Sequence, residues 1–206
     1  MRVTVIDYKA GNLTSVLKAL RHLGADVEVA HADSDSIARA ERIVLPGVGH
    51  FAATKRLEDN GLTTAIRSAI SRGIPFLGIC VGMQWLYAGS SEAPEQAGLG
   101  NFPQLCSRFP DCEQKVPHVG WNSLEVHSGS RLLNGVGSGE FVYFTHSYKA
   151  PVTGDTAGEA FYIEPFAAAV ERGNVMGVQF HPEKSGETGL KILRNFLNWK
   201  QEGATC

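Results

Sequence analysis

A cysteine between two glycines is the residue with the clearest capacity for chemistry in this sequence. Residues 75–84 contain Gly78, Cys80 and Gly82 in a G-x-C-x-G pattern, the layout of a nucleophile elbow with sulfur in place of oxygen. Glycines on both flanks allow a strained turn from strand to helix without Cβ clashes. Such a turn places the thiol at a helix N-terminus, where the positive end of the dipole favours a thiolate. Cys80 is therefore a candidate nucleophile, with a buried structural cysteine as the alternative.

A histidine and a glutamate near the C-terminus supply what a cysteine nucleophile needs. His181, Pro182 and Glu183 follow the apolar run 175–180, which is predicted to be a buried strand. A cysteine nucleophile needs a base, and the base needs an acceptor that orients it. We predict that His181 is the base and that Glu183 steers its imidazole. The order Cys, His, Glu along the chain differs from that of α/β-hydrolases, in which the acid precedes the histidine.

The elements that must position these residues alternate between strand and helix in the first part of the chain. Apolar runs at 3–6, 26–30, 42–45 and 76–79 predict strands. Between them, residues 13–23, 33–41 and 51–72 have helical patterns, the last interrupted near Asn60 and Gly61. This alternation predicts a mostly parallel, doubly wound α/β sheet flanked by helices. Functional groups gather at the carboxyl ends of such strands, where both Cys80 and the turn 46–49 lie.

The second half of the chain has a weaker pattern. A polar loop is predicted from residue 88 to about residue 100. Short strands are then predicted as antiparallel additions to the sheet, at 105–109, 122–126, 140–145, 156–162 and 166–171. The strand 175–180 and a closing helix over 186–199 complete the predicted fold.

Composition limits the classes of partner and cofactor. The 206 residues suit one α/β domain, and we expect a single domain over 1–206. A net charge of −2 without a basic block argues against nucleic acid and anionic membranes as partners. The chain has no apolar run of membrane-spanning length and no signal peptide, so we expect a cytoplasmic protein. Its 4 cysteines have neither disulfide-framework nor zinc-site spacing, and we expect no metal or organic cofactor.

Two motifs together identify a specific resemblance. The segments 78–84 and 177–183 resemble the corresponding motifs of the class I, triad-type glutamine amidotransferases, which have a flavodoxin-like fold. Further stretches resemble one branch, the glutaminase subunits of imidazole glycerol phosphate synthase. These stretches are 7–8, 11–13, 45–49, 115–122, 146–148 and 183–186. Lys9 and Val81 depart from the residues common in the family, and segment 90–114 matches least.

The resemblance implies a mechanism for each residue. Cys80 would attack the side-chain amide of glutamine, His181 would move the proton to the departing ammonia, and Glu183 would hold the imidazole. Backbone N–H groups of Val81 and, after a reorientation of its loop, Val48 would bind the oxyanion. The resemblance also implies that five residues bind the amino and carboxylate groups of glutamine: Gly47, Gly49, Gln84, Ser147 and Tyr148.

The resemblance also implies a partner, because the motifs leave no second domain to consume the ammonia. In the family this partner is a cyclase with a (β/α)8 barrel, and we expect a heterodimer with it. The expected partner face contains Asn12, Trp121 and Lys184. Two other readings stay open: a glutaminase component for anthranilate, guanylate or carbamoyl phosphate synthesis, and a non-catalytic binding module on the same fold. The stretch 115–122 argues against the first of these.

Overall fold

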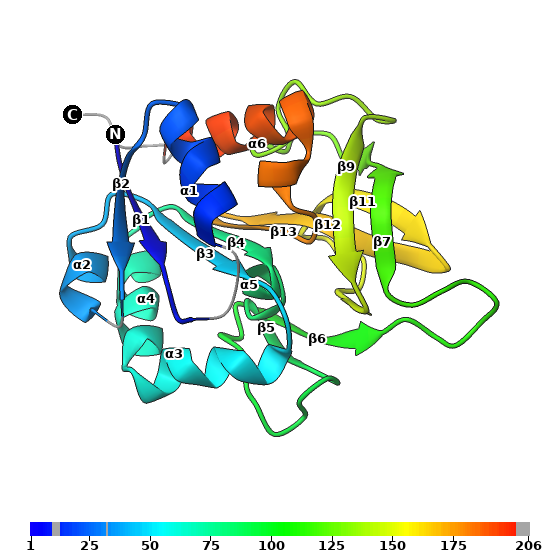
Figure 1. Ribbon diagram of the computed structural model, residues 1–206, viewed down its shortest axis with the longest axis horizontal. Coiled ribbons are helices and arrows are strands. Elements are labelled where there is room, and N and C mark those ends of the chain that lie inside the picture. The colour runs from blue at the N-terminus through cyan, green and yellow to red at the C-terminus, as the bar shows by residue number, and fades with distance from the viewer. Residues whose placement is uncertain (10–12, 32, 201–206) are drawn as a thin grey trace.

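The computed structural model describes residues 1–9, 13–31 and 33–200. These residues form an eight-stranded sheet in the order β2-β1-β3-β4-β13-β12-β11-β8 (Figure 1). Its first five strands are parallel: β2 (Asp26–Ala30), β1 (Arg2–Ile6), β3 (Ile43–Gly47), β4 (Phe76–Cys80) and β13 (Val175–Val178). The last three are antiparallel: β12 (Glu164–Arg172), β11 (Thr156–Tyr162) and β8 (Glu125–Val126). The predicted α/β fold with a mostly parallel sheet is confirmed.

Helices cover both faces of this sheet. Figure 1 shows α1 (Leu13–His22) and α6 (Gly186–Asn198) on one face, and α3 (Lys55–Asp59) and α4 (Leu62–Ser71) on the other. The shorter α2 (Ser34–Ala38) packs against α4, and the turn η1 (Phe51–Thr54) leads into α3. β3, β4 and β13 are buried along their whole length, because helices cover both of their sides. This explains why these strands are continuous apolar runs in the sequence.

Helix boundaries follow local sequence signals. The side chain of Asp33 accepts a hydrogen bond from the backbone N–H of Asp35 and caps α2. Gly24 adopts φ +82° just after α1, a conformation that glycine reaches without strain. Gly61 separates α3 from α4, where the sequence predicts an interruption. The buried side of α1, which includes Val16 and Leu20, faces the sheet.

The prediction for the second half was partly wrong. Of the segments predicted as antiparallel additions, only those that form β8, β11 and β12 join the main sheet. Two small sheets form beside it within the described residues: β7 (His118–Ser123) pairs with β9 (Phe141–His146), and β6 (Phe102–Arg108) lies between β5 (Tyr87–Ser90) and β10 (Tyr148–Lys149). The loop predicted from residue 88 therefore begins with a strand. The strand predicted at 122–126 begins instead at His118 and is interrupted at Leu124.

Exposure on one side of β7 explains that error. Val119 and Trp121 are 56% and 55% exposed, whereas His118 is buried. Apolar residues thus point outward and a polar residue points inward, the reverse of the usual alternation. The hydrophobic pattern of the sequence therefore does not predict this strand. Among the described residues, no helix has the length and apolar character needed to cross a bilayer.

Candidate active site

Cys80 lies in a strained turn between β4 and the short helix α5 (Val81–Gln84). Its backbone has φ +55° and ψ −112°, a region that residues with a Cβ rarely adopt. The side chain is 3% exposed. The predicted strand-to-helix turn is confirmed, and its strain falls on the cysteine itself.

The two flanking glycines allow close approach of three backbone segments. A Cβ on Gly78 would lie 2.7 Å from the backbone nitrogen of Met83. A Cβ on Gly82 would overlap the carbonyl oxygen of Leu45 on β3. Neither glycine has a positive φ. They are therefore needed for packing space between β3, β4 and α5, while Cys80 takes the unusual dihedral angles.

His181 reaches the same edge of the sheet from the neighbouring strand. β13 runs parallel to β4 with Val178 opposite Ile79, and the chain continues into the turn η2 (Pro182–Lys184). The backbone N–H of His181 donates to the carbonyl of Tyr143 at 2.9 Å. Two strands distant in sequence thus end side by side.

The His181–Glu183 pair is buried and hydrogen-bonded. Nδ1 of His181 lies 2.8 Å from Oε1 of Glu183, and the two side chains are 1% and 4% exposed. A carboxylate oxygen only accepts, so Nδ1 carries a proton. Burial lowers the pKa of His181, but the neighbouring Cys80 sulfur and Glu183 carboxylate outweigh it and raise the pKa to about 9. Nε2 has no hydrogen-bond partner among the described residues, which leaves it available to exchange a proton.

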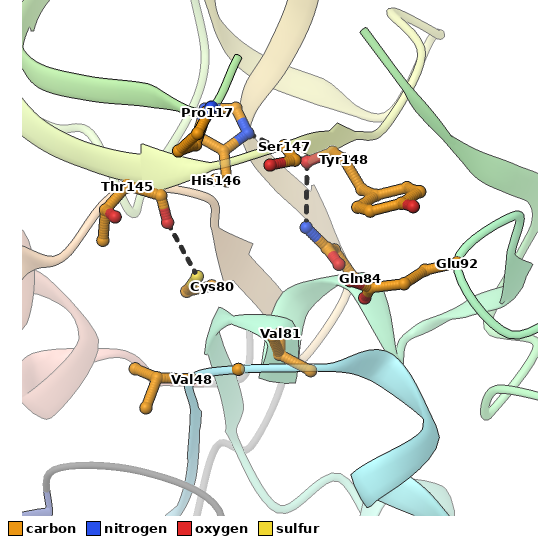
Figure 2. A pocket seen from close by; sticks show the side chains of 11 residues that line it. Val48, Cys80, Val81, Gln84, Glu92, Pro117, Thr145, His146, Ser147 and Tyr148 are labelled. Carbon is orange, nitrogen blue, oxygen red and sulfur yellow. Dashed lines mark hydrogen bonds between the residues drawn. The ribbon is translucent and has the colours of Figure 1, made fainter.

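A pocket of about 260 Å³ opens above the Cys80 sulfur. Figure 2 shows Cys80 between Val48 and Val81 on one side and the segment Thr145–Tyr148 on the other. Its Sγ lies 4.0 Å from the carbonyl oxygen of Thr145. At this volume the pocket lies just below the range of about 300–1,000 Å³ typical of drug-sized ligands, so it suits a small molecule.

Four of the five predicted glutamine contacts line this pocket: Gly49, Gln84, Ser147 and Tyr148. Gly47 lies instead on a smaller neighbouring cavity, together with Tyr8, His181 and Glu183. The two predicted oxyanion donors, Val48 and Val81, also line the main pocket. Val81 is the first residue of α5, so its N–H is one of the unpaired donors of a helix N-terminus.

Gln84 is held by the protein. Its Nε2 donates to the carbonyl of Tyr148 and to Oε1 of Gln179, both at 3.0 Å, so only its Oε1 remains for a ligand. Gln179 also donates to the Cys80 sulfur at 3.7 Å. Gln179 was not predicted as a site residue, although a glutamine inside an otherwise apolar strand segment was a usable signal.

Two of the three predicted partner-face residues lie on one surface. The rings of Trp121 and Tyr143 are 6.1 Å apart, and Nζ of the exposed Lys184 lies 5.7 Å from the centre of the Tyr143 ring. Asn12 lies outside the described residues. The part of the chain that the structure describes contains no group of three His, Cys, Asp or Glu side chains arranged for a metal ion.

Comparison with known proteins matches this chain to a family. Residues 4–199 match the family described as glutamine amidotransferase class-I. The imidazole glycerol phosphate synthase subunit HisH of Moorella thermoacetica is 45% identical over 94% of this chain and 93% of its own length. The chloroplastic imidazole glycerol phosphate synthase hisHF of Arabidopsis thaliana is 44% identical over 96% of this chain, which spans 34% of that longer protein.

A solved structure described as a glutamine amidotransferase has the same fold. It superposes with a TM-score of 0.75 at 21% identity, covering 95% of this chain and 96% of its own. The family match covers almost the whole chain, and the similarity to HisH extends over nearly the full length of both proteins. The chain therefore belongs to the class I glutamine amidotransferases and, among them, to the HisH subunits of imidazole glycerol phosphate synthase.

Proposed function

We propose that this chain hydrolyses L-glutamine to glutamate and ammonia through the triad Cys80, His181 and Glu183, and passes the ammonia to a cyclase subunit. One observation carries the proposal. A strained cysteine at the base of a 260 Å³ pocket shares a sheet edge with a buried histidine–glutamate pair. A nucleophilic thiol has to stay reduced, and Cys80 forms no disulfide, so we also propose a reducing, cytoplasmic location.

The first half-reaction forms a thioester. The Cys80 sulfur, as the thiolate, attacks the side-chain amide carbon of glutamine, and the carbonyl oxygen becomes an oxyanion. The N–H groups of Val81 and Val48 receive this charge, and loss of one such donor typically costs about 10²–10³ in rate. His181 then gives its Nε2 proton to the amide nitrogen, the C–N bond breaks, and ammonia leaves.

The second half-reaction regenerates the enzyme. His181 takes a proton from water, the hydroxide attacks the glutamyl thioester, and the C–S bond breaks to release glutamate and the Cys80 thiolate. Glu183 holds the imidazole throughout and balances its positive charge. The sum is one glutamine and one water converted to one glutamate, one ammonia and the proton that the new carboxyl group releases, without a cofactor.

The pocket walls provide complementary groups for the glutamine backbone. Oε1 of Gln84 is free to accept from the substrate ammonium, and the backbone at Gly49, Ser147 and Tyr148 faces the same space. We assign these residues to substrate binding. Gly47 acts indirectly, because a Cβ there would overlap the Tyr8 hydroxyl and crowd the first two residues of α5, Val81 and Gly82.

The acceptor of the ammonia is a partner protein. Ammonia that escapes into neutral water becomes ammonium, which is not a nucleophile, so the partner must dock beside the pocket. The outer face of the β7–β9 sheet exposes Val119, Trp121 and Phe141, and Thr145 of the same sheet lines the pocket. We propose that a cyclase with a (β/α)8 barrel binds there as a heterodimer, with Trp121 and Lys184 in the interface.

The cyclase would incorporate the nitrogen into imidazole glycerol phosphate and release aminoimidazole carboxamide ribonucleotide. The fused Arabidopsis relative, named hisHF, supports this pairing. Similarity to HisH over nearly the full chain favours this partner over synthases of anthranilate, guanylate or carbamoyl phosphate.

Covalent labelling tests the catalytic assignment. A diazo-ketone analogue of glutamine should modify Cys80 alone among the 4 cysteines, as read by mass spectrometry of peptides. His181→Ala should slow the labelling about 10²-fold or more, because the base is lost. Cys112→Ser, which removes an exposed thiol, is the matched control and should label like the wild type. Modification of another cysteine, or labelling indifferent to His181→Ala, would contradict the triad.

A further inference from the structure

Two buried histidines stand directly behind one wall of the pocket. His118 on β7 and His146 at the end of β9 lie opposite each other in the register of their sheet, and they are 4% and 6% exposed. His146 also lines the pocket. Neither residue belongs to the triad, and the mechanism above uses neither.

Hydrogen bonds determine the position of each imidazole proton. Nδ1 of His146 lies 2.8 Å from the carbonyl oxygen of Tyr148, and a carbonyl only accepts, so this nitrogen carries the proton. Burial lowers the pKa of His146 to about 3, so the ring is neutral and its Nε2 is an acceptor. Nδ1 of His118 lies 3.0 Å from that Nε2 and must therefore be the donor.

The far end of the chain of hydrogen bonds is equally defined. Burial lowers the pKa of His118 to about 4, so its Nε2 is unprotonated. The Nδ2 group of Asn122 faces it at 3.4 Å and also donates to the carbonyl of Phe161 at 2.9 Å. The N–H of Ser123 donates to Oδ1 of Asn122 at 2.8 Å, which fixes the orientation of the amide. All hydrogen bonds of this chain therefore point the same way: each group donates to the next, from the Asn122 amide to the Tyr148 carbonyl.

The near end of the chain meets the proposed substrate site. The Tyr148 carbonyl accepts from His146 and from Nε2 of Gln84; Figure 2 shows the bond from Gln84. One carbonyl oxygen is therefore hydrogen-bonded both to His146 and to Gln84, two of the residues that line the pocket. A carbonyl with two directed donors has little freedom to turn.

We propose that His118 and His146 are positioning residues for glutamine binding: as a pair of neutral Nδ1–H imidazoles, they hold the Ser147–Tyr148 backbone and Gln84 where the substrate amino and carboxylate groups bind. This inference rests on the proposed glutaminase function. The pair touches neither the sulfur nor the scissile amide, so it acts on substrate affinity and not on the chemical step.

Substitution of His118 separates the hydrogen bond from the packing. The ring of His118 stacks on Tyr162 at 4.1 Å and on Phe144 at 4.9 Å. His118→Phe keeps a ring in this stack but removes the donor to His146. His118→Asn loses the ring but keeps a donor where Nδ1 lies. In the complex with a cyclase, we expect His118→Phe to raise the KM for glutamine about tenfold, with kcat within about twofold, because one buried hydrogen bond is lost. His118→Asn should recover most of that loss.

Two alkylating reagents test whether the effect is confined to substrate positioning. The diazo-ketone analogue needs the glutamine contacts, whereas iodoacetamide needs only access to the thiol. His118→Phe should slow the first reaction about tenfold and leave the rate of the second unchanged. Equal slowing of both, or of neither, overturns the positioning role. Failure of the wild type to react with the glutamine analogue would instead contradict the proposed function.

Nitrogen NMR of the wild-type protein tests the pair without any substitution. Both rings should show a protonated Nδ1 and an unprotonated Nε2, with no titration between pH 6 and pH 8, around the ordinary histidine pKa of about 6.5. A proton on Nε2 of either ring, or titration near that value, overturns the inference even if the variants fail to fold.

Discussion

At the scale of single residues, the site depends on backbone strain concentrated at Cys80. A non-glycine residue at φ +55° and ψ −112° costs on the order of 1–3 kcal/mol, and packing must hold it there. Gly78 and Gly82 allow this packing, because the backbones of β3, β4 and α5 are in contact at these two positions. The position of Cys80 thus depends on direct backbone contacts at the two glycines, and any side chain there would force these backbones apart.

Enlarging Gly82 should therefore damage the fold as well as the site. In Gly82→Ala the new methyl overlaps the Leu45 carbonyl, and we expect the free energy of unfolding to fall by about 1–3 kcal/mol or more. Urea titration followed by circular dichroism measures this change. Gly154→Ala is the control, because its new methyl meets no atom within 4 Å. Equal free energies of unfolding for the two variants would contradict this prediction and show that the β3 backbone can move to accommodate the methyl group.

The raised pKa of His181 makes stability depend on pH in a defined direction. Burial opposes protonation, but Cys80 and Glu183 raise the pKa from 6.5 to about 9 on folding. This stabilisation is fully present below pH 6.5 and is lost as the pH rises through 9. The free energy of unfolding should thus fall over that interval, and by less in Glu183→Gln. Urea midpoints at pH 6.5 and pH 9 measure both declines; an equally steep decline in the variant would exclude Glu183 as a cause.

At the scale of elements, the β7–β9 sheet has two chemically different faces. Its inner face contains His118, Phe144 and His146, which pack behind the pocket, and its outer face exposes Val119 and Trp121. An exposed apolar face of this kind marks an interaction surface. The same two strands therefore border both the proposed substrate site and the proposed partner interface.

Trp121→Ala tests the outer face. Because the indole is 55% exposed, its removal should leave the melting temperature of the isolated chain nearly unchanged. Affinity for the cyclase should fall about 30-fold or more, the effect of losing an aromatic anchor worth at least about 2 kcal/mol. Isothermal titration calorimetry measures the affinity. Leu105→Ala, which truncates a 62% exposed side chain on β6, is the control and should bind normally. Unchanged binding of Trp121→Ala would place the interface elsewhere.

At the scale of the whole molecule, we propose that the loop after β3 links binding of the cyclase to catalysis. Val48 is 36% exposed, between Gly47 and a Gly49 with φ +93°, so the peptide before Val48 can turn at little cost. We expect glutamine hydrolysis to be slow for the isolated chain and to rise when cyclase and acceptor bind, because docking selects the conformation that presents the Val48 N–H. Coupled assays of glutamate release with and without the cyclase measure this. Equal rates in both would sink the idea.

Much of the catalytic half of the fold was predictable from local pattern. The parallel strands are continuous apolar runs, and the doubly wound arrangement brings their carboxyl ends together. Cys80 and the His181–Glu183 pair could therefore be placed at one edge before any coordinates were known. Two residues near the sulfur were harder to place from sequence. Gln179 was not predicted as a site residue, although its side chain donates to the Cys80 sulfur, and Gly47, a predicted glutamine contact, lines the neighbouring smaller cavity.

The sequence by itself determined the strand-to-helix turn at Cys80, the strand end that carries His181 and Glu183, and the parallel part of the sheet, because the periodicity or residue spacing of a short segment specifies each of them. Only the tertiary structure decided that β7 and β9 form a separate sheet, that His118 and His146 meet behind the pocket, and that Gln84 is tied to Tyr148 and Gln179. These contacts join segments 28 to 95 residues apart. Such contacts form only when the whole chain packs. The hydrophobic pattern of one segment does not specify which distant segment it will contact.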